Sequence, residues 1–216
     1  TTEKKVAKAW NDFGGLITAL SHIVGIDPGC AVAVICVESS GKGFSADKRM
    51  IIRFENHKFW KFWGKQHLNQ FNEHFKYQKG KAWLGHEFRS SANADWNNFH
   101  GKQSREWDVF NFAKGLDEPA AMQSISMGLP QIMGFNHAAI GYESPGKMFS
   151  RFQFDIRYHI LGLFDFLRGA GTTSPMLQAL QRSQYDQFAS HYNGSGQAAK
   201  YATLIENHFE TFKNLA

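Results

Sequence analysis

The sequence has little cysteine, with Cys30 and Cys36 as its two thiols in 216 residues. They lie six positions apart on what the residue pattern predicts to be one helix, so their side chains point to different faces. A disulfide between them is not expected, and both are interpreted as small buried thiols. The fold therefore has to depend on its hydrophobic core, for which an apolar content of 43% is sufficient.

Long apolar runs are also missing. The longest candidate covers about residues 30–37, well short of the roughly 18 residues of a membrane-spanning helix, so no membrane span is expected. The stretch TTEKKVAKAW lacks the apolar segment of a signal peptide, so the chain is expected either not to be secreted by that route or to be a mature form. Without a proline-rich linker, low-complexity tract or internal repeat, residues 1–216 are predicted to form a single domain.

The net charge is +5, but the Lys and Arg residues form no run of five or more. This charge favours anionic partners such as nucleic acid, a membrane surface or the bacterial cell wall. Nucleic-acid binding is not predicted, because no basic stripe or motif accompanies the charge. The ten histidines show no HxH or HExxH spacing, so no metal site is predicted. No glycine-rich phosphate loop or G-x-S-x-G motif is present, so neither a cofactor nor a serine nucleophile is expected.

Helical periodicity dominates what is present. It predicts a helix over residues 3–24, a second helix capped by Asp27 with Pro28 in its first turn, and further helices at about 117–126, 147–168, 175–190 and 197–213. The segment MIIRF (50–54) is typical of a short strand. Residues 56–108 have weak periodicity and predict an inserted lobe, at about 60–110, of short helices and loops. The fold predicted is mainly α, with a small β or loop region.

One acid ends the most apolar segment, AVAVICVESSGKGF (31–44). If residues 29–38 form a helix, Ala31, Val34, Ile35 and Glu38 share one face. Burial and the negative end of the helix dipole would both raise the pKa of Glu38, which suits a general acid. The alternative is an acid that simply reaches solvent where the helix ends.

Two later segments favour a site. SISMGLPQIMGFN (124–136) places Gly128, Pro130 and Gly134 around Gln131, and glycine permits close approach of a ligand. FASHYNGSG (188–196) ends an apolar helix with Tyr192 and Asn193 before two glycines. Either segment alone is more typical of a helix end, but their combination and order with Glu38 indicate a functional site.

An acid followed by serine, then G-L-x-Q-I, then Y-N is the signature of the lysozyme-like superfamily, which includes goose-type lysozymes and soluble lytic transglycosylases. The chain resembles its phage-endolysin-type N-acetylmuramidases in VESSGKGF (37–44), IIRFENHKF (51–59), AAMQSISMGLPQIMGFNHAAIGY (120–142) and HYNGSG (191–196). The resemblance extends from about residue 28 to the C-terminus, loosely over 60–110. It implies a lysozyme-like α+β globule that cleaves the β-1,4 bond between N-acetylmuramic acid and N-acetylglucosamine in bacterial peptidoglycan. A monomer acting on the cell wall is expected, whether secreted, periplasmic or delivered by a phage or effector.

The resemblance also implies roles for residues. Glu38 would be the catalytic acid, and Glu55 either a second catalytic carboxylate or a buttress of the site, with Asp47 and Asp95 as other candidates for the second carboxylate. The substrate-binding residues would be Ser39, Met127, Gln131, Tyr192 and Asn193. Met127 and Pro130 depart from the family's usual Trp and Phe. Loss of the Trp from a glycan cleft predicts an altered sugar preference, such as for deacetylated glycan.

Three questions stay open from sequence. The sugar's own 6-hydroxyl, rather than water, could attack C1 and make the protein a lytic transglycosylase with 1,6-anhydro products. A cell-wall binding module without activity is a second alternative. Finally, the tryptophans of the lobe could line a sugar cleft or brace the lobe, and bracing is preferred for Trp60, Trp63, Trp83, Trp96 and Trp107.

Overall fold

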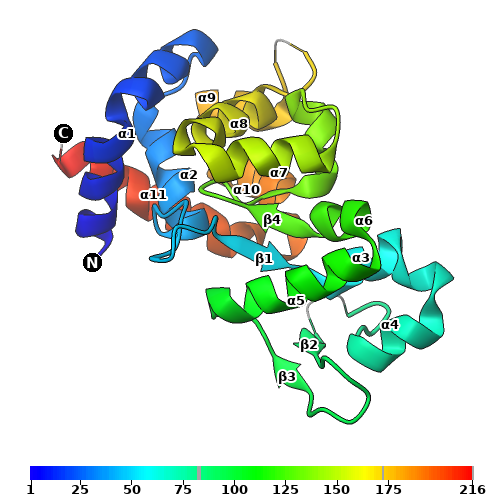
Figure 1. Cartoon of the computed structure of the whole chain (residues 1–216). Helices are drawn as coiled ribbons and strands as arrows, with labels where there is room; N and C mark the ends of the chain where they lie inside the picture. The colour runs from blue at the N-terminus through cyan, green and yellow to red at the C-terminus, as the bar shows by residue number, and fades with distance from the viewer. Residues whose placement is uncertain (82–83, 172, 216) are drawn as a thin grey trace.

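The computed structural model describes residues 1–81, 84–171 and 173–215. Figure 1 shows a largely helical molecule with a small central sheet and a lobe at the end opposite the N-terminal helix. The helices are α1 (Thr2–Val24), α2 (Pro28–Ser39), α3 (Asn56–Phe62), α4 (Leu68–His74), α5 (Gln103–Leu116), α6 (Glu118–Gln123), α7 (Pro145–Phe154), α8 (Ile156–Arg168), α9 (Pro175–Gln181), α10 (Tyr185–Asn193) and α11 (Ala198–Leu215). The strands are β1 (Ile52–Phe54), β2 (Glu87–Phe88), β3 (Asn97–Asn98), β4 (Ile125–Met127) and β5 (Ile132–Met133).

Most predicted helices are present, but two of the periodic segments are interrupted. The Asp27 carboxylate accepts a hydrogen bond from the Gly29 amide at 2.8 Å, as expected for the N-cap of α2. The pattern over 147–168 is divided at Asp155, which ends α7 and accepts a hydrogen bond from the Arg157 amide as the N-cap of α8. The pattern over 175–190 is likewise divided, between α9 and α10. The predicted helix at 117–126 ends at Gln123, because residues 125–127 pair in the sheet.

Helix α2 is the centre of the first of two hydrophobic clusters. Every residue from Gly29 to Cys36 is buried, and the helix packs against α1 and α11. The expectation of one apolar face was therefore too narrow, since α2 is surrounded on all sides. The interpretation of Cys30 and Cys36 as buried, unbridged thiols is confirmed.

Among the residues that the structure describes, no single helix is long and apolar enough to cross a membrane. By length and composition alone, the bent pair of α1 and α2 would qualify. In this structure the apolar residues of α2 are already covered by neighbouring helices.

The sheet has the antiparallel order β1-β4-β5 and carries the second hydrophobic cluster. Ile52 lies opposite Met127 across β1 and β4, and Ser126 lies opposite Met133 across β4 and β5. This sheet forms next to the C-terminal end of α2 (Figure 1). The turn between β4 and β5 contains Gly128 and Gln131, both with positive φ.

The sequence predicts that glycines near this turn leave space for a ligand. In the structure, the space beside two of them is filled by other parts of the protein. A Cβ on Gly128 would collide with the ring of His159, and one on Gly134 would collide with the backbone carbonyl of Met122. His159 is fully buried, and its Nδ1 accepts a hydrogen bond from the Leu129 amide at 3.1 Å while Nε2 lies 2.6 Å from the Phe152 carbonyl. Burial lowers the pKa of His159 to about 4, so a neutral imidazole attaches the turn to α8.

The lobe shares its hydrophobic cluster with the sheet. Phe75 contacts Phe54 of β1 with ring centroids 6.1 Å apart, and Phe59 of α3 at 5.1 Å. Phe71 and Phe99, also from the lobe, belong to the same cluster. Because the lobe and sheet share one core, the structure supports the single-domain interpretation, which stays a prediction.

Two lobe tryptophans brace the structure. Trp63 is buried and stacks on Phe59 with centroids 5.0 Å apart, and Trp107 is buried and donates from Nε1 to the Met50 carbonyl at 3.0 Å. Trp60 is partly buried against Tyr77. Trp96 is partly buried against the charged groups of Lys76 and Arg89. Trp83 lies outside the described residues.

Asn56 fastens the lobe to the start of α3, and its replacement tests this role. Its Nδ2 lies 2.9–3.1 Å from the carbonyl oxygens of Lys76, Gly85 and Glu87, and the residue is 2% exposed. Asn56→Ala removes the donor from these carbonyls and should lower the free energy of unfolding in urea by about 2 kcal/mol. Asn72→Ala, at an exposed position of α4, is the control and should change it by less than about 0.5 kcal/mol. Equal losses in the two variants would contradict the role of Asn56.

Candidate active site

Glu38 lies in the last turn of α2, where the central helix reaches the surface. The helix ends at Ser39, and its C-cap residue, Ser40, has left-handed backbone conformation with φ of 56°. Asn193 Nδ2 donates a hydrogen bond to Glu38 Oε1 at 2.7 Å. Burial raises the pKa of Glu38 to about 7, although the Asn193 hydrogen bond and the charge of Arg53 act in the opposite direction. A carboxyl with this pKa is partly protonated at neutral pH, as a general acid requires.

The C-terminal end of α10 faces Glu38 and joins it to the sheet. The Tyr192 hydroxyl donates a hydrogen bond to the Pro130 carbonyl at 2.6 Å, and its ring packs on Phe188 and Phe166. Burial and the nearby Glu38 carboxyl raise the pKa of Tyr192 well above its ordinary value, so the phenol is neutral. Tyr192 therefore positions α10 on the β4–β5 turn, and Asn193, one residue on, reaches Glu38.

Gln131 uses its amide within the turn. Its Oε1 accepts a hydrogen bond from Ser126 Oγ at 2.7 Å, and its Nε2 donates to the carbonyls of Gly128 at 2.8 Å and Ile51 at 3.4 Å. These bonds hold the turn whose Pro130 carbonyl accepts from Tyr192. The side chain remains partly exposed, but its hydrogen-bonding groups mainly serve the protein.

Two of the predicted substrate contacts look different in the structure. Met127 is fully buried in the cluster around the sheet, so it offers no surface to a glycan, and the expectation that it lines a cleft is corrected. All three residues of β4 are buried, so both faces of this strand, including the position of Met127, lie inside the core. The argument for an altered sugar preference loses its basis with it. Ser39 is partly exposed beside Glu38, while its hydroxyl donates to the Ile35 carbonyl at 3.1 Å.

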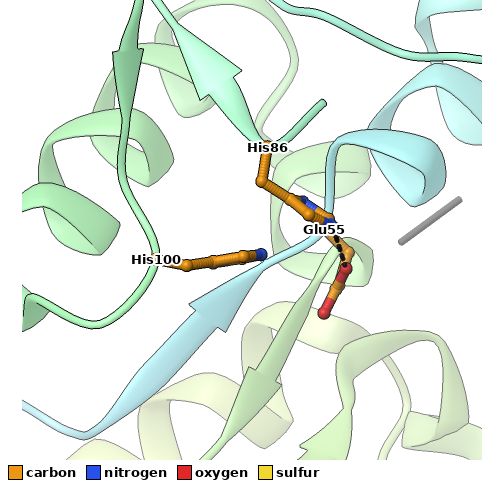
Figure 2. Close-up of side chains that lie close together, drawn as sticks. All are labelled: Glu55, His86 and His100. Atoms are coloured by element: carbon orange, nitrogen blue, oxygen red, sulfur yellow. Dashed lines mark ion pairs between the residues drawn. The ribbon is translucent and has the colours of Figure 1, made fainter. Parts of the chain in front are cut away.

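Glu55, between β1 and α3, is surrounded by basic side chains. Arg53 Nε donates to its Oε1 at 3.0 Å, while His57 Nδ1 and His86 Nε2 lie 3.4 and 3.7 Å from Oε2. Figure 2 shows His86 and His100 directed toward this carboxylate. Burial favours a higher pKa for Glu55, but His57 and the charges of His86 and Arg53 outweigh it and lower the pKa. One carboxylate oxygen of Glu55 thus accepts a hydrogen bond from Arg53, and the other is approached by His57 and His86 without a hydrogen bond.

Two residues that the sequence analysis missed connect Glu38 with Glu55. Arg53, whose side chain is 55% exposed, pairs with Glu55, and its charge also lowers the pKa of Glu38. Tyr201 on α11 is close to both acids: burial raises the pKa of its hydroxyl, Glu38 and Glu55 raise it further, and Arg53 lowers it. The position of Arg53 in a predicted strand, two residues before Glu55, was a signal for the first. Nothing in the sequence singles out Tyr201.

Comparison with known proteins identifies the family and the fold. A family model described as N-acetylmuramidase matches residues 27–213. The structure is similar to the crystal structure of the Burkholderia AP3 phage endolysin, with a TM-score of 0.70 and 22% sequence identity over 92% of this chain and 70% of that one. This likeness confirms the predicted mainly α, lysozyme-like fold. No curated protein matches the sequence.

The raised pKa of Glu38 predicts a pH-dependent cost in stability. The carboxyl titrates near 4.5 in the unfolded chain and near 7 in the folded one, so between these values the unfolded state releases its proton first and stability falls as pH rises. Glu38→Gln keeps an acceptor for Asn193 but has no charge. It should be more stable than the wild type by up to about 3 kcal/mol above about pH 8, and equally stable near pH 4.

Thermal and urea unfolding across this range measure the difference. Glu143→Gln, at an exposed position, is the matched control and should follow the wild type at every pH. A constant difference between Glu38→Gln and wild type at all pH values would mean that Glu38 has an ordinary pKa.

Proposed function

The chain belongs to the N-acetylmuramidase family, and we propose that Glu38 is the general acid with which it cleaves the β-1,4 bond between N-acetylmuramic acid and N-acetylglucosamine. The predicted resemblance to phage-endolysin-type muramidases is confirmed, and with it the assignment as a glycoside hydrolase that acts on bacterial peptidoglycan. The residues that perform the cleavage are the subject of the proposal.

The observation that carries the proposal is the protonatable, hydrogen-bonded carboxyl of Glu38. Asn193 donates to Oε1, so the acidic proton is held on Oε2, free to transfer to the glycosidic oxygen. The carboxylate left behind keeps the Asn193 hydrogen bond and gains the attraction of Arg53, both of which favour the charged form. The same carboxylate can then accept a proton from the attacking water.

Tyr192 and Gln131 both support this geometry through the β4–β5 turn. Tyr192 fixes the end of α10 through the Pro130 carbonyl, and Gln131 fixes the turn itself. Ser39 and the exposed edge of Gln131 are assigned to the surface that a glycan strand would cross.

Glu55 is proposed as a positioning residue and not as the second carboxylate of the reaction. Glycosidases commonly use two carboxylates, one of which attacks the sugar or activates water. The oxygens of Glu55 are instead engaged by Arg53 and approached by His57 and His86. Glu55 would thus act on Glu38 through Arg53. This arrangement leaves Glu38 as both acid and base.

Mass spectrometry of fragments released from purified sacculi tests the reaction. The wild type should produce reducing muramic acid ends, and 1,6-anhydro ends would instead identify a transglycosylase. Glu38→Gln should lower kcat by about 1,000-fold or more, because a positioned general acid contributes about 10²- to 10⁴-fold. Glu143→Gln is the control with the same chemical change at an exposed position. Solubilisation by Glu38→Gln at the wild-type rate would overturn the proposal.

Arg53 provides a second test, through the pH profile of kcat/KM. The acid must be protonated, so kcat/KM should fall as pH rises through about 7. Arg53 lowers the pKa of Glu38, and Arg53→Gln should therefore move this fall to higher pH by roughly half a unit, since the exposed charge is partly screened.

Arg182→Gln, on an exposed part of the surface, is the charge-matched control and should leave the profile in place. Glu55→Gln should also change the pH at which kcat/KM falls, while retaining most of kcat. Loss of activity in Glu55→Gln as severe as in Glu38→Gln would identify Glu55 as a catalytic carboxylate.

A further inference from the structure

Three side chains of types that can bind a metal meet where the lobe joins the rest of the protein. Glu55, His86 and His100 each offer one ligand atom, and these atoms all lie within 4.8 Å of one another (Figure 2). Glu55 precedes α3, His86 precedes β2, and His100 follows β3. The cluster therefore connects the core of the protein to the hairpin of the lobe. The sequence predicts no metal site here, because three separate segments supply the residues.

The orientation of His100 is fixed as in a metal site. Its Nδ1 lies 2.8 Å from Oε1 of Glu106, a carboxylate that is 2% exposed and whose Oε2 accepts from the Phe54 amide at 2.8 Å. A carboxylate behind a histidine fixes the ring's tautomer and leaves the other nitrogen as a lone-pair donor to a metal. That other nitrogen, Nε2, is buried and has no hydrogen-bond partner among the described residues.

Two neighbouring histidines, His86 and His57, also have a buried ring nitrogen without a hydrogen-bond partner among the described residues. His86 is 6% exposed, with its Nε2 3.7 Å from Glu55 Oε2 and its Nδ1 buried without a partner in the described chain. His57 Nδ1 is also buried, 3.4 Å from the same oxygen and outside hydrogen-bond geometry. Buried polar atoms are rarely left unsatisfied in proteins. Two of these atoms, His100 Nε2 and His57 Nδ1, belong to side chains beside the Glu55 carboxylate and are potential metal ligands, which indicates that something else fills the space.

We propose that Glu55, His86 and His100 bind a divalent transition-metal ion of the zinc class. Two imidazoles and one carboxylate are donors that suit Zn²⁺ and not Mg²⁺ or Ca²⁺, which prefer oxygen. Two atoms bound tetrahedrally at about 2.0–2.1 Å are about 3.4 Å apart, close to the 3.7 Å between His86 and Glu55. Small rotations of the side chains bring the third ligand in. His57 Nδ1 or a water molecule completes the coordination.

The ion has a structural role that follows from its position. It holds the β2–β3 hairpin against the start of α3, where Asn56 already binds the same segment of the lobe. Glu55 can ligate through Oε2 while Oε1 keeps its hydrogen bond to Arg53. This inference does not depend on the proposed chemistry at Glu38.

The test is zinc binding by the tag-free, full-length chain after treatment with a chelator and dialysis. Titration with Zn²⁺ against a competing chromophoric chelator should give a single equivalent with a dissociation constant of about 1 μM or lower. At about hundredfold excess over that constant, Tm should rise by roughly 5–10 °C. The absence of binding tighter than about 100 μM in the wild type would overturn the proposal.

Variants locate the ion. His86→Gln and His100→Gln should each weaken binding more than about 100-fold, and Glu106→Gln, which affects the orientation of His100, by about 10- to 100-fold. His22→Gln on α1 is the control, because His22 is exposed and far in sequence from the cluster. Wild-type affinity in both His86→Gln and His100→Gln would place the ion elsewhere and contradict the assignment.

Discussion

The burial of α2 from Gly29 to Cys36 is the constraint on which the rest of the structure depends. This helix is enclosed by α1 and α11 over most of its length, and it ends in a carboxyl that the helix carries into the same poorly solvated environment. Burial raises the pKa of Glu38 because the charged form loses water. The hydrophobic core thus does more than stabilise the fold: it sets the protonation state of Glu38, the proposed general acid. The same burial reduces stability wherever Glu38 ionises, which is a cost often found at functional sites.

The neighbours of Glu38 are positioned by a chain of hydrogen bonds that begins in the sheet. Gln131 holds the β4–β5 turn, the Pro130 carbonyl of that turn holds Tyr192, and Asn193 follows on the same helix to reach Glu38. The buried His159 attaches the other side of this turn to α8. Residues that a sequence motif groups as ligand contacts therefore act mainly as supports. Their strict geometry is what a single acid requires if it is to serve first as proton donor and then as base.

The sequence predicted secondary structure correctly where neighbouring residues alone determine it. Asp27 and Pro28 predicted the start of α2, and the apolar periodicity predicted α1, because capping and helix periodicity need only nearby residues. The helix break at Asp155 was missed although its signal is local, since Asp155 caps α8 as Asp27 caps α2. The burial of Met127 was not predictable, because it depends on packing against distant segments. The assignment of Asn193 and Glu38 to one site depended on the resemblance, since no local pattern joins α2 to α10. The cluster around Glu55 had no motif, because His86 and His100 reach it only through the fold of the lobe.

The central claim is that folding makes Glu38 a proton donor near neutral pH, and the most direct measurement is its own titration. Carbon-13 NMR of the side-chain carboxyl in glutamate-labelled protein, assigned by comparison with Glu38→Gln, reports this pKa without any substrate. The structure predicts a midpoint near pH 7. A midpoint near 4.5, the ordinary value of a glutamate, would mean that Glu38 is ionised at neutral pH and that the buried end of α2 does not provide the acid.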